Sequence, residues 1–154
     1  MLNFLAVSIL AFSGIFFGKI LRKIAFEEVN NYKKYLIYLQ YLVLFVLAIS
    51  LVYYLDLSFI VLIFFALGFL SSFLFRKRYF YLGLILASSV FNLDLLVFSS
   101  SLVFLYGLSF GALSMGILLN LLYIILGFAL VFILPSDFNP YILAFSAGSI
   151  FLRY

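Results

Sequence analysis

The side chains that could do chemistry in this chain are few, and Asp94 is the most informative of them. It stands next but one to Asn92. The serines on either side of this pair are Ser88, Ser89, Ser99, Ser100 and Ser101. A carboxylate held among such polar groups inside a helical bundle can bind a cation or relay a proton. The same Asn-x-Asp composition also suits a solvated turn, so the sequence leaves both interpretations open.

Three further polar groups lie within apolar segments, namely Ser99, Ser100 and Asn120. Such groups form hydrogen bonds between neighbouring helices or line a polar path. Together with Asn92 and Asp94 they make up the candidate site for a small solute or ion.

Enzymatic chemistry has little support, because the chain contains no His and no Cys. An imidazole base, a thiolate nucleophile and an ordinary zinc site are therefore excluded. Serine is plentiful, but a Ser nucleophile needs a base, and the Lys and carboxylate candidates lie almost entirely at the edges of apolar segments. We predict that the protein is not an enzyme, with no catalytic residue, no bound metal and no cofactor.

The composition is that of a membrane protein. Hydrophobic residues make up 69% of the chain, charged residues 9%, and the mean hydropathy is +1.37. Soluble domains are about 45–50% apolar and about 25% charged. Apolar stretches near the 20-residue spanning length recur throughout, and no segments alternate as barrel strands would. The sequence predicts one all-α, polytopic transmembrane helical bundle that fills residues 1–154 as a single integral membrane domain.

The charges predict how the chain crosses the bilayer. The basic residues are Lys19, Arg22, Lys23, Lys33, Lys34, Arg76, Lys77, Arg78 and Arg153. They cluster at the ends of apolar segments, and Asp56, Asp94 and Asp137 fall in the gaps between the clusters. By the positive-inside rule the N-terminus is outside and the C-terminus cytoplasmic, in the cell membrane. The net charge of +4 therefore indicates no nucleic-acid partner.

Within this topology, the basic clusters are expected to lie against lipid headgroups at the inner surface. These residues are Arg22, Lys23, Lys33, Lys34, Arg76, Lys77 and Arg78. The linker between the first two spans also carries Glu27 and Glu28, which are expected to pair with Arg22, Lys23 or Lys33.

Seven spans fit the pattern best. The first three are predicted over residues 2–21, 35–55 and 58–75, and the last over 141–152. Three more fit between residues 79 and 134, with turn formers at 92–94, 107–111 and 135–140 marking the breaks. This odd number of crossings returns Arg153 to the side of the other basic residues.

An alternative threading keeps the same sidedness. Residues 79–91 and 95–106 would each form a helix of only about 18–20 Å, shorter than a 30 Å membrane core. They could form a re-entrant hairpin that places Asn92 and Asp94 at mid-membrane, beside five full spans. We favour seven spans.

Gly14 and Gly18 form a Gly-x-x-x-Gly pattern, which lets helix backbones approach closely. We expect it to pack helices within the monomer, with a homodimer through the same face as the alternative. Small residues also recur in the last span, at Ala144, Ala147 and Gly148, so the first and last spans are expected to pack together.

Two functions from different classes follow. The first is a secondary transporter or channel-like protein for a small solute or ion, with its polar site near Asn92, Asp94 and the serines; short spans broken by Gly and Ser favour it. The second is a non-catalytic membrane subunit or scaffold that contacts lipid or a partner, favoured by the scarcity of ionisable groups within the spans.

Overall fold

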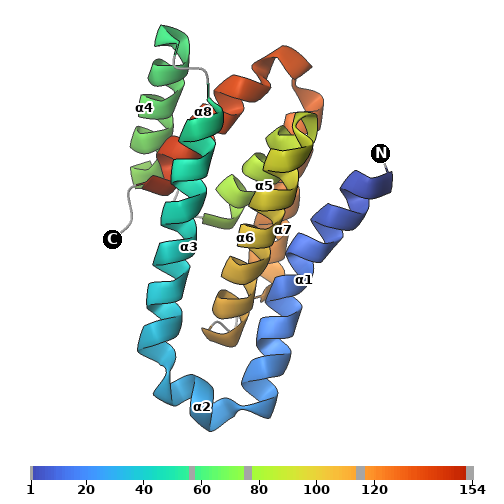
Figure 1. Cartoon of the computed structure of the whole chain (residues 1–154), viewed down its shortest axis with the longest axis vertical. Helices are drawn as coiled ribbons and strands as arrows, with labels where there is room; N and C mark the ends of the chain where they lie inside the picture. Colours follow the sequence, from blue (N-terminus) through green and yellow to red (C-terminus); the bar gives the residue numbers. More distant parts are fainter. Residues whose placement is uncertain (1, 56–57, 75–77, 114–116, 152–154) are drawn as a thin grey trace.

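A computed structural model describes residues 2–55, 58–74, 78–113 and 117–151, and 95% of it is helical with no strands among these residues. This confirms the all-α class. The helices are α1 (Leu2–Ile24), α2 (Phe26–Asn31), α3 (Lys33–Tyr54), α4 (Phe59–Leu74), α5 (Arg78–Ser88), η1 (Ser89–Phe91), α6 (Leu93–Leu113), α7 (Ile117–Ile133), η2 (Ser136–Phe138) and α8 (Asn139–Phe151). Figure 1 shows the long helices lying side by side, with α2 turning the chain between α1 and α3.

Two of the helices in the described residues, α3 with 22 residues and α6 with 21, are long and apolar enough to cross a membrane. At 1.5 Å per residue they extend about 31–33 Å, which matches a bilayer core. α4 and α7 are apolar but shorter. A bundle with two such helices is what the structure supports directly, and the seven expected spans are taken up under the proposed function.

Two of the sequence-based boundaries are wrong. The break expected at residues 107–111 does not exist, because α6 runs unbroken through Gly107 and Gly111 to Leu113. The 12-residue helix of the hairpin alternative is wrong for the same reason. These glycines serve close helix packing instead of a turn.

Three parallel helix pairs organise the molecule, and each is joined along what we call a glycine seam. In α1 and α6, Gly14 meets the backbone of Phe104 and Gly18 meets that of Leu108, so residue numbers rise together along both helices. In α4 and α8, Gly68 meets the backbone of Phe145.

The third seam joins α5 and α7, where Gly83 meets the backbone of Ile124. A return contact completes each seam from the partner helix: Gly111 on Ile15, Gly148 on Phe65, and Gly127 on Phe80. In each pair, the glycine of the partner helix follows the residue contacted by the first helix's glycine by three positions. These are Gly111 after Leu108, Gly148 after Phe145 and Gly127 after Ile124. This repeated spacing fixes the same backbone approach three times.

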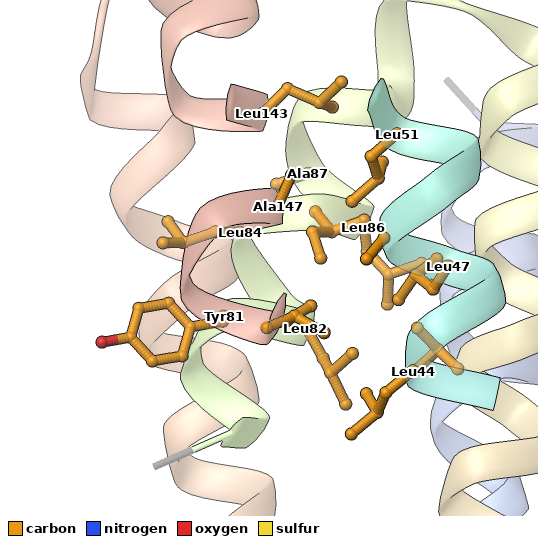
Figure 2. Close-up of a cluster of buried hydrophobic side chains, with 14 of the residues drawn as sticks. Leu44, Leu47, Leu51, Tyr81, Leu82, Leu84, Leu86, Ala87, Leu143 and Ala147 are labelled. Carbon is orange, nitrogen blue, oxygen red and sulfur yellow. The ribbon is translucent and has the colours of Figure 1, made fainter. Parts of the chain in front are cut away.

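Four helices, α3, α5, α6 and α8, form the centre, and their contacts with one another are continuous. α1, α4 and α7 each pack chiefly on one of them, which are α6, α8 and α5 respectively. Figure 2 shows the apolar side chains where α3, α5 and α8 meet, with Leu47 and Leu86 facing each other at its middle. α1 and α8 are thus not principal partners, so the expected pairing of the first and last spans is wrong.

The two ends of the bundle differ in charge. The described basic residues Lys19, Arg22, Lys23, Lys33 and Lys34 lie around the end of α1 and the start of α3, which we call the basic end. Arg78, at the start of α5, lies further into the bundle, over the Tyr41 ring of α3. Asp94 and Asp137 lie at the opposite end, the acidic end, where α4, α6 and α8 begin. α1, α4, α6 and α8 run towards the basic end, and α3, α5 and α7 run away from it (Figure 1).

The surface carries many large apolar side chains, and serines are buried among the apolar residues of the core. Large apolar side chains are exposed along α1, α4 and α7, for example Ile9 at 65% and Leu70 at 58%. Serines lie inside: Ser99, Ser109 and Ser146 are each fully buried. Their hydroxyls donate mostly to carbonyl oxygens one turn earlier in the same helix.

Candidate solute pocket

A pocket of about 520 Å³ opens at the acidic end, between α4 and α8 on one side and α3, α5 and α6 on the other. Its lining residues are Tyr54, Leu55, Ser58, Val61, Ser88, Asn92, Leu95, Ser136, Asn139, Pro140, Tyr141 and Leu143. The volume lies within the range of about 300–1,000 Å³ that is usual for small-molecule sites. Most of the polar groups are hydroxyls and amides, and none of the lining side chains is charged.

The pocket lies where α5 ends. α5 has 11 residues and extends about 16 Å, and after Ser88 the chain continues as η1 (Ser89–Phe91) to the start of α6 at Leu93. Its last residue, Ser88, is buried and lines the pocket. Short polar side chains also line the space beside it.

Asn92 has a structural role that also orients it in the pocket. Its Oδ1 accepts hydrogen bonds from the backbone N–H groups of Asp94 at 3.1 Å and Leu95 at 3.2 Å, which makes it the cap of α6. The carbonyl oxygen of the side chain is thereby occupied, and the amide N–H₂ group remains as a donor. At the start of α4, Ser58 Oγ accepts from the Val61 N–H at 3.3 Å.

Asn139 is one of two buried polar residues of the lining, with 7% of its surface exposed. No hydrogen bond is found for its side chain within the described ranges. Ser88 is likewise buried, but its hydroxyl already donates to the Leu84 carbonyl oxygen at 2.8 Å. The amide of Asn139 lines the pocket and is therefore available to a bound solute.

The structure brings only some of the predicted site residues together. Asn92 and Leu95 line the pocket, whereas Asp94 between them is exposed and is not among the lining residues. The interpretation of Asp94 as a solvated residue at the start of a helix therefore fits its position better than the interpretation as a buried carboxylate. Asp94 and Asp137 still give the rim a negative charge.

Ser99 and Ser100 lie deeper in α6, both buried and outside the pocket lining. Ser99 Oγ donates to Ser89 Oγ at 3.4 Å, and Ser89 lies next to the pocket-lining Ser88. This hydroxyl pair links α6 to the end of α5 just beneath the pocket. Asn120 lies near the start of α7, at the level of the start of α5, so it belongs to the other end of the bundle.

The predicted packing role of Gly14 and Gly18 has its counterpart in the seam with α6. A methyl group at Gly18 would overlap the Leu108 carbonyl oxygen. Because α6 covers this face, a homodimer through it would require α1 to leave α6.

At the basic end, Arg22 donates through Nη1 to the Leu113 carbonyl oxygen at 3.4 Å. The expected ion pairs of Glu27 and Glu28 are not formed among the described residues, since both carboxylates are exposed on α2. Lys23, Lys33 and Lys34 are also exposed. Arg78 lies over the Tyr41 ring at 5.4 Å. Of the predicted headgroup-facing residues, Arg76 and Lys77 lie outside the described residues.

Sequence reasoning missed Ser58, Asn139 and Tyr141, which complete the pocket. Ser58 and Asn139 each stand at the start of a helix, where short polar residues are common as caps. That signal was readable for each residue separately, but their convergence depends on the pairing of α4 with α8. Comparison with protein-family models, with curated proteins and with solved structures gives no match for this chain.

Proposed function

We propose that this protein is a multi-pass membrane protein that binds a small polar solute or ion in the acidic-end pocket and moves it as a secondary transporter or channel-like protein. The observation that carries the proposal is the pocket itself: a space of about 520 Å³ whose described lining combines apolar side chains with serine and asparagine side chains, in a bundle that exposes many large apolar side chains.

The exposed apolar side chains support a lipid environment. Monomeric soluble proteins rarely expose contiguous apolar patches larger than a few hundred Å². In lipid, helices instead associate through small residues and hydrogen-bonding hydroxyls, as the glycine seams and buried serines do here.

The alternating helix directions support the proposal of seven crossings, with α1 and α3 to α8 as the spans, of which α5 and α8 are short at 11 and 13 residues. Five of the described basic residues, Lys19, Arg22, Lys23, Lys33 and Lys34, share one end, which by the positive-inside rule would be cytoplasmic. In this arrangement the N-terminus is outside, the C-terminus is cytoplasmic, and the pocket opens to the outside of the cell membrane. The short α5 and α8 resemble the shortened helices that transporters use to form binding sites.

The pocket chemistry favours a solute with several hydrogen-bonding groups. The Asn92 and Asn139 amides offer donors, and the Ser88 hydroxyl oxygen offers an acceptor. The exposed carboxylates of Asp94 and Asp137 at the rim favour neutral or cationic solutes over anions.

The test begins with binding. Full-length protein purified in detergent is screened by thermal stability against polyols, sugars, amines, amino acids and monovalent and divalent cations. A solute that binds should raise the melting temperature of the wild type and of Ser101→Leu, because Ser101 is exposed outside the pocket. The same solute should not change the melting temperature of Asn139→Leu, because that variant removes an amide and fills the pocket.

Uptake of the same solute into proteoliposomes then distinguishes transport from binding alone. Uptake that Asn139→Leu abolishes supports the proposal. Absence of any solute that distinguishes Asn139→Leu from Ser101→Leu would count against it.

The alternative is a membrane scaffold without a solute. Its specific support is that no Asp, Glu, Lys or Arg side chain among the described residues lines the pocket, whereas transporters of charged solutes usually keep a charged residue in the bundle. A scaffold would show no solute-dependent stabilisation, and Asn139→Leu would behave as the wild type in assembly.

A further inference from the structure

A second cavity lies at the basic end, where α1, α2, α3 and α6 meet. Its volume is about 80 Å³. Its polar lining is Arg22, Asn30 and Lys33, and Phe26, Val29 and Ala112 are among the apolar residues that close it. It is far from the acidic-end pocket and plays no part in the proposed solute site.

The cavity has an excess of positive charge. Arg22 and Lys33 line it, and neither forms an ion pair within the part of the chain that the structure describes. Arg22 uses one N–H on the Leu113 carbonyl oxygen, and a guanidinium has five N–H donors in total. Glu27 and Glu28 stand on the adjoining helix α2, but neither lines the cavity.

The α6 carbonyl that faces this site is already matched by Arg22. The Asn30 side chain adds a neutral hydrogen-bonding group next to the two cations. Two cations and an amide around one small space are the donors that a phosphate oxygen cluster requires.

The size and the border of the cavity agree with such a ligand. One buried water needs a cavity volume of roughly 10–15 Å³, so a cavity of about 80 Å³ holds several waters or one tetrahedral anion. Phe26 is 59% exposed at the cavity and Ile24 is 81% exposed beside α2. An apolar border next to a cationic site is suited to a ligand with a phosphate head and a hydrocarbon tail.

We infer that the cavity between α1, α2, α3 and α6 is a binding site for a phosphate group, held by Arg22, Lys33 and Asn30. α2 then serves as a clamp, since Asn30 and Phe26 both belong to it. The inference is independent of solute transport, and it concerns one defined cavity, beyond a general attraction of basic residues to lipid.

The experiment uses the full chain in a neutral detergent, titrated with dioctanoyl phosphatidylglycerol, dioctanoyl phosphatidylcholine or inorganic phosphate. Native mass spectrometry and thermal shift report binding. The wild type should bind the anionic lipid, and Lys33→Gln should weaken binding about fivefold, the usual effect of one basic residue on anionic lipid.

The matched control is Lys23→Gln, which removes the same charge at the same end but does not line the cavity. It should weaken binding less than twofold. Arg22→Gln also removes a contact to α6, so Lys33→Gln is the decisive variant and Asn30→Leu is the second.

The two phosphate sources give different results. Competition of inorganic phosphate with phosphatidylglycerol indicates a site for free phosphate as well as lipid, whereas binding of the lipid alone indicates a headgroup site. Equal weakening by Lys33→Gln and Lys23→Gln, or no preference for phosphatidylglycerol over phosphatidylcholine, would overturn the inference.

Discussion

The glycine seams and the acidic-end pocket differ in how closely the helices approach one another. Along the seams, α4 and α8 approach until Gly68 touches the Phe145 backbone. One or two turns towards the acidic end, the same two helices diverge from α3, α5 and α6 and leave a space of about 520 Å³. α4 and α8 pack closely at their glycines, and they are separated from α3, α5 and α6 near the end of α5.

This difference shows how so apolar a sequence specifies one arrangement. Leu and Phe give little selectivity between helix faces in lipid, because lipid tails are as apolar as they are. Glycine determines which helix faces pack together and how closely the backbones approach. Short polar residues line the space where the helices do not pack closely. Substitutions in the seams are therefore expected to lower stability, and substitutions in the pocket to weaken solute binding.

The largest effect should come from breaking a seam. In Gly68→Leu the new side chain would overlap the Phe145 backbone, which cannot move without separating α4 from α8. We expect a loss of about 3 kcal/mol or more of stability, seen as aggregation or a much lower melting temperature in size-exclusion and thermal assays. Ala66→Leu, on the exposed face of the same helix, is the control and should be nearly neutral. Similar behaviour of the two variants would mean that the seam does not hold α4 to α8.

A smaller effect is expected at the pocket. Asn92→Ala removes the cap of α6, and losing such a cap costs about 1 kcal/mol. Asn92→Ser should recover most of this stability because its hydroxyl can accept the same hydrogen bond. Solute binding should fall in both variants, since neither restores the amide N–H₂ group. Full binding by Asn92→Ser would place the solute away from Asn92.

The smallest effect is expected at the rim. Asp94 is exposed in the first turn of α6, where a carboxylate contributes roughly 0.3–1 kcal/mol through the helix dipole. Asp94→Asn should therefore lower stability by less than about 1 kcal/mol and change the affinity for a cationic solute only a few-fold, less at high salt. Complete loss of binding in Asp94→Asn would instead assign it a direct contact, as the interpretation of a buried carboxylate requires.

Several parts of this picture were readable in the sequence. Apolar segments ended by basic clusters predicted the helices, and five of the described basic residues lie at one end, although Arg78 lies further into the bundle. The Gly14–Gly18 spacing predicted a packing face, and Asn92 was recognised as a polar group of interest.

The partners of these features were not readable. Gly14 packs on α6 and not on α8, although the last span offers an equally small face at Ala147 and Gly148. Gly107 and Gly111 were taken as turn formers because composition alone does not separate a turn from a seam. Their four-residue spacing, the same as that of Gly14 and Gly18, is the signal that identifies a helix face.

The pocket could not be predicted because its walls come from distant parts of the chain. Ser58 and Asn139 meet only because α4 pairs with α8, and the hollow lies where α5 ends at Ser88. The length of a single helix and the choice of a partner are properties of the folded bundle.

The central claim is that the bundle lies in a membrane with the pocket facing outside, and cysteine accessibility tests it most directly. The chain has no cysteine, so single replacements report one position each. In intact cells, a membrane-impermeant thiol reagent should label Asp94→Cys at the pocket rim. It should label Lys34→Cys only after permeabilisation, and Leu67→Cys, which is 48% exposed on α4, in neither case because lipid covers it. Rapid labelling of Leu67→Cys, or labelling of Lys34→Cys from outside, would contradict the account.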